Sequence, residues 1–144
     1  PQHLRLAHHS GEVHRAWAVC QMAETQHLAL CSLATWRHTC SGGIEWHHIV
    51  NRGKLQKNPY ARAFAERSYP ELFMAQVCHV ANVSRLADGR QAQAILMRNV
   101  VALWGREHVE GVWESFLELW KPGSMKSLDA ILSALPADAP RPVV

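Results

Sequence analysis

Two short segments, residues 45–50 and 77–82, constrain this chain more than any other feature. The first, Glu-Trp-His-His-Ile-Val, places His47 beside His48 in a strand-like stretch. The second, Val-Cys-His-Val-Ala-Asn, ends on Asn82 where a helix is expected to begin. One neutral imidazole can bind a metal ion, a second can take a proton from water, and an amide carbonyl can serve as another ligand. We therefore expect the two segments to meet around one metal ion and one water.

Together the two segments resemble the HNH, or His-Me finger, endonucleases, whose core is a short hairpin followed by a helix around one divalent metal. His47-His48-Ile49 is similar to the family's first motif, Asp-His-Ile or His-His-Ile. The segment 77–82 is similar to the closing motif Leu-Cys-x-x-Cys-Asn in relatives of the phage junction-resolving endonucleases. The resemblance covers roughly residues 40–92.

The resemblance implies metal-dependent hydrolysis of phosphodiester bonds in nucleic acid, with DNA as the expected partner. His48 would be the general base, and His47 and Asn82 would hold one divalent ion, with His79 as the competing ligand. A histidine ligand in place of aspartate softens such a site. Manganese, nickel or zinc are therefore expected to bind as well as magnesium.

The cysteines depart from the family pattern. Ala81 stands where the second Cys of the closing motif is expected, and the Cys-x-x-Cys pairs with which related nucleases often hold a structural zinc are missing. Cys20 and Cys31 fall on an apolar stripe and are expected to pack as small hydrophobic side chains. Cys40 and Cys78 flank the expected hairpin and could approach each other. A structural zinc is therefore not expected, and without a secretory signal neither are disulfides.

A basic stretch follows the histidine pair and takes the place of the family's glycine-rich loop. Its cationic residues are Arg52, Lys54, Lys57, Arg62 and Arg67, whereas Glu107, Glu110, Glu114 and Glu118 lie far downstream. A basic patch beside a metal site suits a phosphate backbone, and Arg52 or Arg85 could clamp a phosphate. The alternative is a solvated helix face balanced by the acidic one.

Apolar spacing predicts a single, mostly helical α+β domain with a small ββα-metal core inserted between N- and C-terminal helices. The expected elements are a helix over 10–38, the core over 40–92 with strands at 44–50 and 73–77, helices over 93–135, and a loose tail over 136–144. Within the core, a short helix is expected over 59–67 and another from Ala81, with a turn at 51–53.

Length and charge narrow the function classes only slightly. A chain of 144 residues can bury one core, and its formal charge of +3 is too mild to indicate nucleic acid by itself. No apolar run is long enough for a bilayer and no signal peptide is evident, so an intracellular protein without a membrane partner is expected. The apolar C-terminal helices could pair two copies as a homodimer.

Two alternatives to an enzyme remain. One is a catalytically inactive domain that only binds nucleic acid, and the other is a helical interaction protein whose histidine pair holds a structural metal. The adjacent His47 and His48 favour the enzyme, because a binder has no need for the second histidine.

Overall fold

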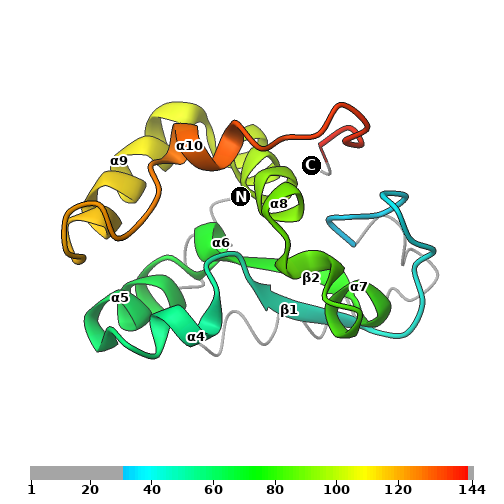
Figure 1. Cartoon of the computed structure of the whole chain (residues 1–144), viewed down its shortest axis with the longest axis horizontal. Coiled ribbons are helices and arrows are strands. Elements are labelled where there is room, and N and C mark those ends of the chain that lie inside the picture. The colour runs from blue at the N-terminus through cyan, green and yellow to red at the C-terminus, as the bar shows by residue number, and fades with distance from the viewer. Residues whose placement is uncertain (1–30, 143–144) are drawn as a thin grey trace.

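The computed structural model describes residues 31–142 and has a mostly helical α+β fold around one antiparallel hairpin (Figure 1). Strand β1 (Ile44–His48) pairs with β2 (Met74–Cys78), in a register that runs from Ile44 opposite Cys78 to His48 opposite Met74. The expected fold class is thus confirmed. β1 ends two residues earlier than expected, because beyond His48 the chain turns away and the Asn51 side chain caps the next helix.

The segment between the strands folds as four short helices. In chain order they are α4 (Arg52–Leu55), α5 (Pro59–Ala63), the π-helical turn η3 (Phe64–Ser68) and α6 (Pro70–Phe73). Asn51 Oδ1 accepts from the backbone N–H groups of Gly53 and Lys54, so the expected turn is the first turn of α4. Asn58 Oδ1 caps α5 in the same way.

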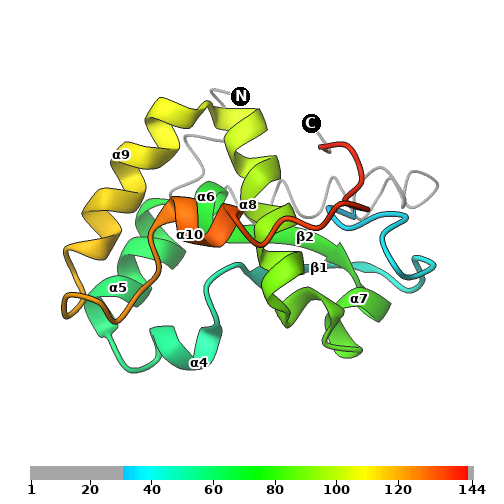
Figure 2. The ribbon, with the colours of Figure 1, turned by 45° about the horizontal axis from the view of Figure 1, so that its top comes forward.

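Helix α7 (His79–Val83) begins directly after β2, and the short η4 (Leu86–Asp88) leads into the C-terminal helices. These are α8 (Arg90–Trp104), α9 (Arg106–Leu117) and α10 (Leu128–Leu132). Figures 1 and 2 show α4, α5 and α9 at one end of the molecule, and α7 with the loop 31–40 at the other. No helix within residues 31–142 is long and apolar enough to cross a bilayer.

An aromatic cluster joins the inter-strand segment to α9. The Phe73 ring stacks on Trp113 with centroids 5.5 Å apart and lies 4.7 Å from Phe116, which also contacts Phe64. Phe73, Phe116 and Trp113 are at most 3% exposed, so burial of these rings holds this half of the core together.

Two expected elements differ in the structure. Residues 31–38 form turns, not the end of a helix, because Thr35 and Arg37 have φ angles of 69° and 56° that a right-handed helix excludes. The rest of the expected N-terminal helix, 10–30, lies outside the described residues. The tail is not loose over 136–142: Arg37 donates twice to Asp138, and Arg98 donates to the Pro140 carbonyl.

Candidate metal centre and hairpin–helix cluster

Four metal-ligating side chains meet between the loop 31–40 and the end of β2. We call Cys31, His38, Cys40 and Cys78 the Cys3His cluster; their ligand atoms all lie within 4.8 Å of one another. His38 Nε2 is 3.8 Å from Cys31 Sγ and 3.5 Å from Cys40 Sγ. Of the described residues, no other group of three or more His, Cys, Asp or Glu ligand atoms comes as close.

The spacing of these atoms suits a tetrahedral zinc site. Zinc–sulfur bonds of about 2.3 Å and zinc–nitrogen bonds of about 2.05 Å give tetrahedron edges of about 3.6 Å from sulfur to nitrogen and about 3.8 Å between sulfurs. The two distances from His38 Nε2 to sulfur, 3.8 Å and 3.5 Å, lie close to the sulfur–nitrogen edge. Four protein ligands would fill the coordination sphere and leave no position for a reacting water, as in structural zinc sites.

Hydrogen bonds orient the cluster for metal binding. His38 Nδ1 lies 2.8 Å from the Trp36 carbonyl oxygen and can only donate to it, which leaves Nε2 with its lone pair facing the sulfurs. The backbone N–H of Cys78 donates to Cys31 Sγ at 3.3 Å, and that of Ala81 donates to Cys78 Sγ at 3.4 Å. Cys78 is therefore both a candidate ligand and the N-cap of α7.

Burial raises the pKa of the Cys31 and Cys40 thiols, and the neighbouring thiols raise that of Cys40 further, because thiolates crowded together repel one another. A bound divalent cation reverses this balance, since it binds the thiolate form and releases the proton. Three thiolates in this arrangement would repel one another without a cation, whereas a bound cation would stabilise all three.

A second polar group joins β1 to α7. We call Glu45, His47, His79, Asn82 and Asp88 the hairpin–helix cluster. Asn82 Nδ2 donates to Glu45 Oε1 at 2.7 Å, and His79 Nδ1 lies 2.5 Å from Glu45 Oε2. His47 Nδ1 lies 3.4 Å from Asn82 Oδ1 and 3.9 Å from Asp88 Oδ1. The expected meeting of His47 and Asn82 is present, and His79 joins them through Glu45.

The cluster has the donor set that a hard divalent ion would use. Because the Asn82 amide nitrogen faces the Glu45 carboxylate, the amide oxygen is turned toward His47. Asp88 adds a carboxylate oxygen, so oxygen ligands could surround an ion beside one imidazole. Burial lowers the pKa of His47, which is 8% exposed, although Asp88 and Asn82 act in the opposite direction. The ring is therefore neutral at pH 7 and can accept a metal or a proton.

His48 lies apart from this cluster. Alternation along β1 sends His47 and His48 to opposite faces, and His48 Nε2 contacts Glu66 Oε2 of η3 at 2.8 Å. Glu66 Oε1 in turn accepts from Arg62 Nε at 3.1 Å. Burial raises the pKa of Glu66, but these two hydrogen bonds outweigh it and lower the pKa overall. The structure thus brings His47, but not His48, to Asn82.

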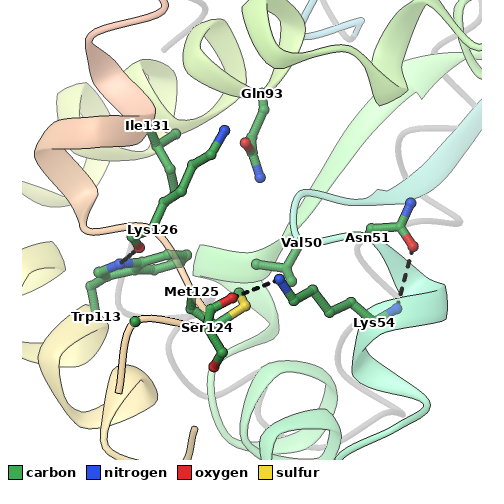
Figure 3. A pocket seen from close by; sticks show the side chains of 10 residues that line it. Val50, Asn51, Lys54, Gln93, Trp113, Ser124, Met125, Lys126 and Ile131 are labelled. Carbon is green, nitrogen blue, oxygen red and sulfur yellow. Dashed lines mark hydrogen bonds between the residues drawn. The ribbon is translucent and has the colours of Figure 1, made fainter. Parts of the chain in front are cut away.

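The basic stretch is partly engaged within the protein. A hollow of about 420 Å³ lies beside Lys54, whose ammonium donates to the Ser124 carbonyl at 2.7 Å. Figure 3 shows this bond and, among the other lining residues, the bond that Trp113 donates to the Lys126 carbonyl. Arg62 is paired with Glu66. The other basic residues of the stretch, Arg52, Lys57 and Arg67, are exposed.

Sequence reasoning missed several members of both clusters. Cys31 was assigned to an apolar stripe, and His38 was placed at the end of a helix. The spacing Cys-x₆-His-x-Cys over 31–40 was the available signal, because short Cys/His spacings are typical of zinc sites. No local pattern pointed to Asp88, which reaches His47 only through the turn after α7.

Comparison with protein-family models, with curated proteins and with solved structures found no match. The Cys3His cluster and the hairpin–helix cluster are therefore the two features of the chain that bear on its function.

Proposed function

We propose that this chain is a nucleic-acid-binding protein whose hairpin and helix are held together by a structural zinc ion. The observation that carries the proposal is the convergence of Cys31, His38, Cys40 and Cys78 within 4.8 Å. The ion would fasten the loop 31–40 to the residue from which α7 starts. The position of Asn82 relative to β1 would then depend on the zinc.

The link to nucleic acid comes from the motifs around the zinc. Residues 47–49 and 77–82 resemble the HNH motifs, and related nucleases often hold a structural zinc with two Cys-x-x-Cys pairs. Cys78 stands where that family places a zinc-binding cysteine, and His38 from the preceding loop would stand in for the cysteine replaced by Ala81. A Cys3His set thus also offers four ligands, with one imidazole in place of one thiolate and without Cys-x-x-Cys pairs.

The metal content of the purified full chain tests the structural proposal. We expect one zinc per chain, lost in His38→Ala and kept in the matched control His79→Ala, whose ring lies outside the Cys3His cluster. A chelator should lower the thermal midpoint of the parent and of His79→Ala, because a structural zinc contributes to folding. A metal-free parent, or equal zinc in both variants, would overturn the structural site.

Phosphodiester hydrolysis is a second candidate function, favoured by the 3.4 Å approach of His47 to Asn82. In this reaction a water attacks phosphorus, its proton passes to a histidine, and the ester bond to the leaving oxygen breaks. His47, Asn82 Oδ1 and Asp88 would hold one magnesium or manganese ion, which would stabilise charge on the phosphate. The resemblance assigns the proton to His48, which would first have to leave Glu66.

Cleavage of duplex, branched and single-stranded DNA with magnesium or manganese tests this candidate. If His48 is the base, His48→Ala should lose about a hundredfold to ten-thousandfold of the rate. If cleavage instead survives in His48→Ala, the assignment of His48 as the base is wrong; His47→Ala should lose cleavage in either case, because His47 would hold the ion. A zinc-loaded parent that binds DNA but cleaves none of these substrates would remove the second candidate and leave the first.

A further inference from the structure

A groove beside η4 is rich in arginine. It has a volume of about 800 Å³ and is bounded by the loop 31–40, the α7–α8 connection, the first turn of α8 and the residues after α10. Arg37, Arg85 and Arg90 line it, and none of its lining residues within 31–142 is acidic. We call these three residues the arginine groove.

The three arginines differ in what already binds them. Arg37 is fixed, because its guanidinium donates to both Asp138 oxygens and to Gln91 Oε1 and lies 4.5 Å over the Trp36 ring. Its charge is balanced by Asp138. Arg85 and Arg90 are exposed and form no ion pair with any residue in 31–142. As far as residues 31–142 show, the groove therefore offers two guanidinium groups without an ion-pair partner, beside the bound Arg37 side chain.

The groove is tied to the hairpin–helix cluster by the chain itself. The Arg85 N–H donates to the Asn82 carbonyl at 3.2 Å, and Arg90 begins α8 just after Asp88, whose carboxylate faces His47. An extended polyanion seated in the groove would thus pass directly beside the hairpin–helix cluster. The basic stretch 52–67 is the competing site: Lys54 and Arg62 are already bound within the protein, whereas Arg52, Lys57 and Arg67 are exposed and do not line the groove.

We propose that Arg85 and Arg90 in the arginine groove bind backbone phosphates of a nucleic acid that lies against the hairpin–helix cluster. This inference rests on the proposed nucleic-acid binding and adds the path that the sugar–phosphate backbone takes over the protein. Guanidinium groups suit phosphate because they donate two parallel hydrogen bonds to its oxygens. Arg37, held by Asp138, forms the wall of the groove and is not itself counted as a phosphate ligand.

Binding of a labelled 20-base-pair DNA duplex, measured over a series of salt concentrations without divalent metal, tests the proposal. The Arg85→Gln/Arg90→Gln variant should lose about two units of the slope of log affinity against log salt, one for each phosphate contact. The matched control is Lys57→Gln/Arg67→Gln, which also removes two exposed charges and should keep nearly the parent slope. Unchanged zinc content and thermal midpoint would show that both variants are folded.

The outcomes separate this inference from the proposed function. If the parent and the Arg85→Gln/Arg90→Gln variant bind the duplex with the same slope of log affinity against log salt, the phosphate contacts proposed for the groove are wrong. Nucleic-acid binding by the chain would still stand. A control that flattens the slope more than the groove variant moves the phosphate contacts to the stretch 52–67. A zinc-loaded parent that binds no duplex overturns both nucleic-acid binding and the groove.

Discussion

At the scale of single residues, the Asn82 amide decides the character of the hairpin–helix cluster. Its nitrogen donates to Glu45 and its oxygen faces His47, so one neutral side chain separates an acid from an imidazole. The hydrogen bond from Asn82, followed by that from His79, lowers the pKa of Glu45. This contribution to stability is present above the ordinary pKa of 4.5 and is lost as pH falls through the lower folded value.

Asn82→Asp should reverse this dependence. A carboxylate would then face Glu45 Oε1 where an N–H donor stood 2.7 Å away, which raises the pKa of Glu45 and lowers the thermal midpoint at pH 7. Acidification toward pH 5 should recover part of the loss. If the cluster binds a divalent ion, millimolar magnesium or manganese should also recover it, because the cation stabilises both carboxylates.

The matched control is Asn51→Asp, measured by thermal unfolding under the same conditions. Asn51 caps the exposed start of α4, where aspartate caps as well as asparagine. The free energy of unfolding of Asn51→Asp should therefore differ from that of the parent by less than about 0.5 kcal/mol. An Asn82→Asp protein that is as stable as the parent at pH 7 without metal would contradict the reported contact between Asn82 and Glu45.

At the scale of elements, the closeness of β1 and α7 depends on Gly42. Its φ of 78° is a conformation that L side chains rarely adopt, and a Cβ added there would lie 2.5 Å from His79 Cβ. Gly42→Ala should therefore push the start of β1 away from α7. We expect a loss of about 1–3 kcal/mol of unfolding free energy together with weaker zinc binding.

Gly105→Ala provides the comparison for that variant. Gly105 joins α8 to α9 at a φ of 90°, but an added Cβ there meets nothing within 4 Å, so only the backbone cost remains. Denaturant unfolding of both variants separates the two effects. A Gly105→Ala protein as destabilised as Gly42→Ala, with zinc affinity equal in the two, would show that contact with His79 is unimportant.

The elements also show what the sequence could reveal. The hairpin and the three C-terminal helices were predicted because alternation and three-and-four spacing are local signals. The contact between His47 and Asn82 followed from a motif resemblance. The approach of Cys40 and Cys78 was expected from the hairpin, but the Cys3His cluster was missed because Cys31 and His38 were assigned to a helix that the loop 31–40 replaces. The contact between Glu66 and His48 was not predicted either, because η3 reaches His48 only after the inter-strand segment has folded back.

At the scale of the whole molecule, the two ends in Figure 1 are stabilised by different means. The end with α5 and α9 has the aromatic cluster around Phe73, whereas the end with α7 and the loop 31–40 gathers polar and thiol side chains. His47 lies almost buried between β1 and η4 at this second end. Protonation of His47 would place a charge in a poorly solvated position and would lower the free energy of global unfolding.

The stability of the molecule should therefore fall in mild acid through His47. Because burial lowers the folded pKa of His47 below the ordinary 6.5, its contribution is present above pH 6.5 and is lost as pH falls through the folded value. His47→Gln removes this titration. The parent should thus be the more acid-sensitive protein, and the difference in midpoint between the two should shrink from pH 7.5 to pH 5. Zinc held as proposed by the Cys3His cluster would be released in acid from both proteins, so its effect should cancel in the difference, which zinc content measured at each pH would check. A constant difference across this range would mean that the His47 ring is solvated in the folded state, which would also weaken its assignment as the neutral partner of Asn82.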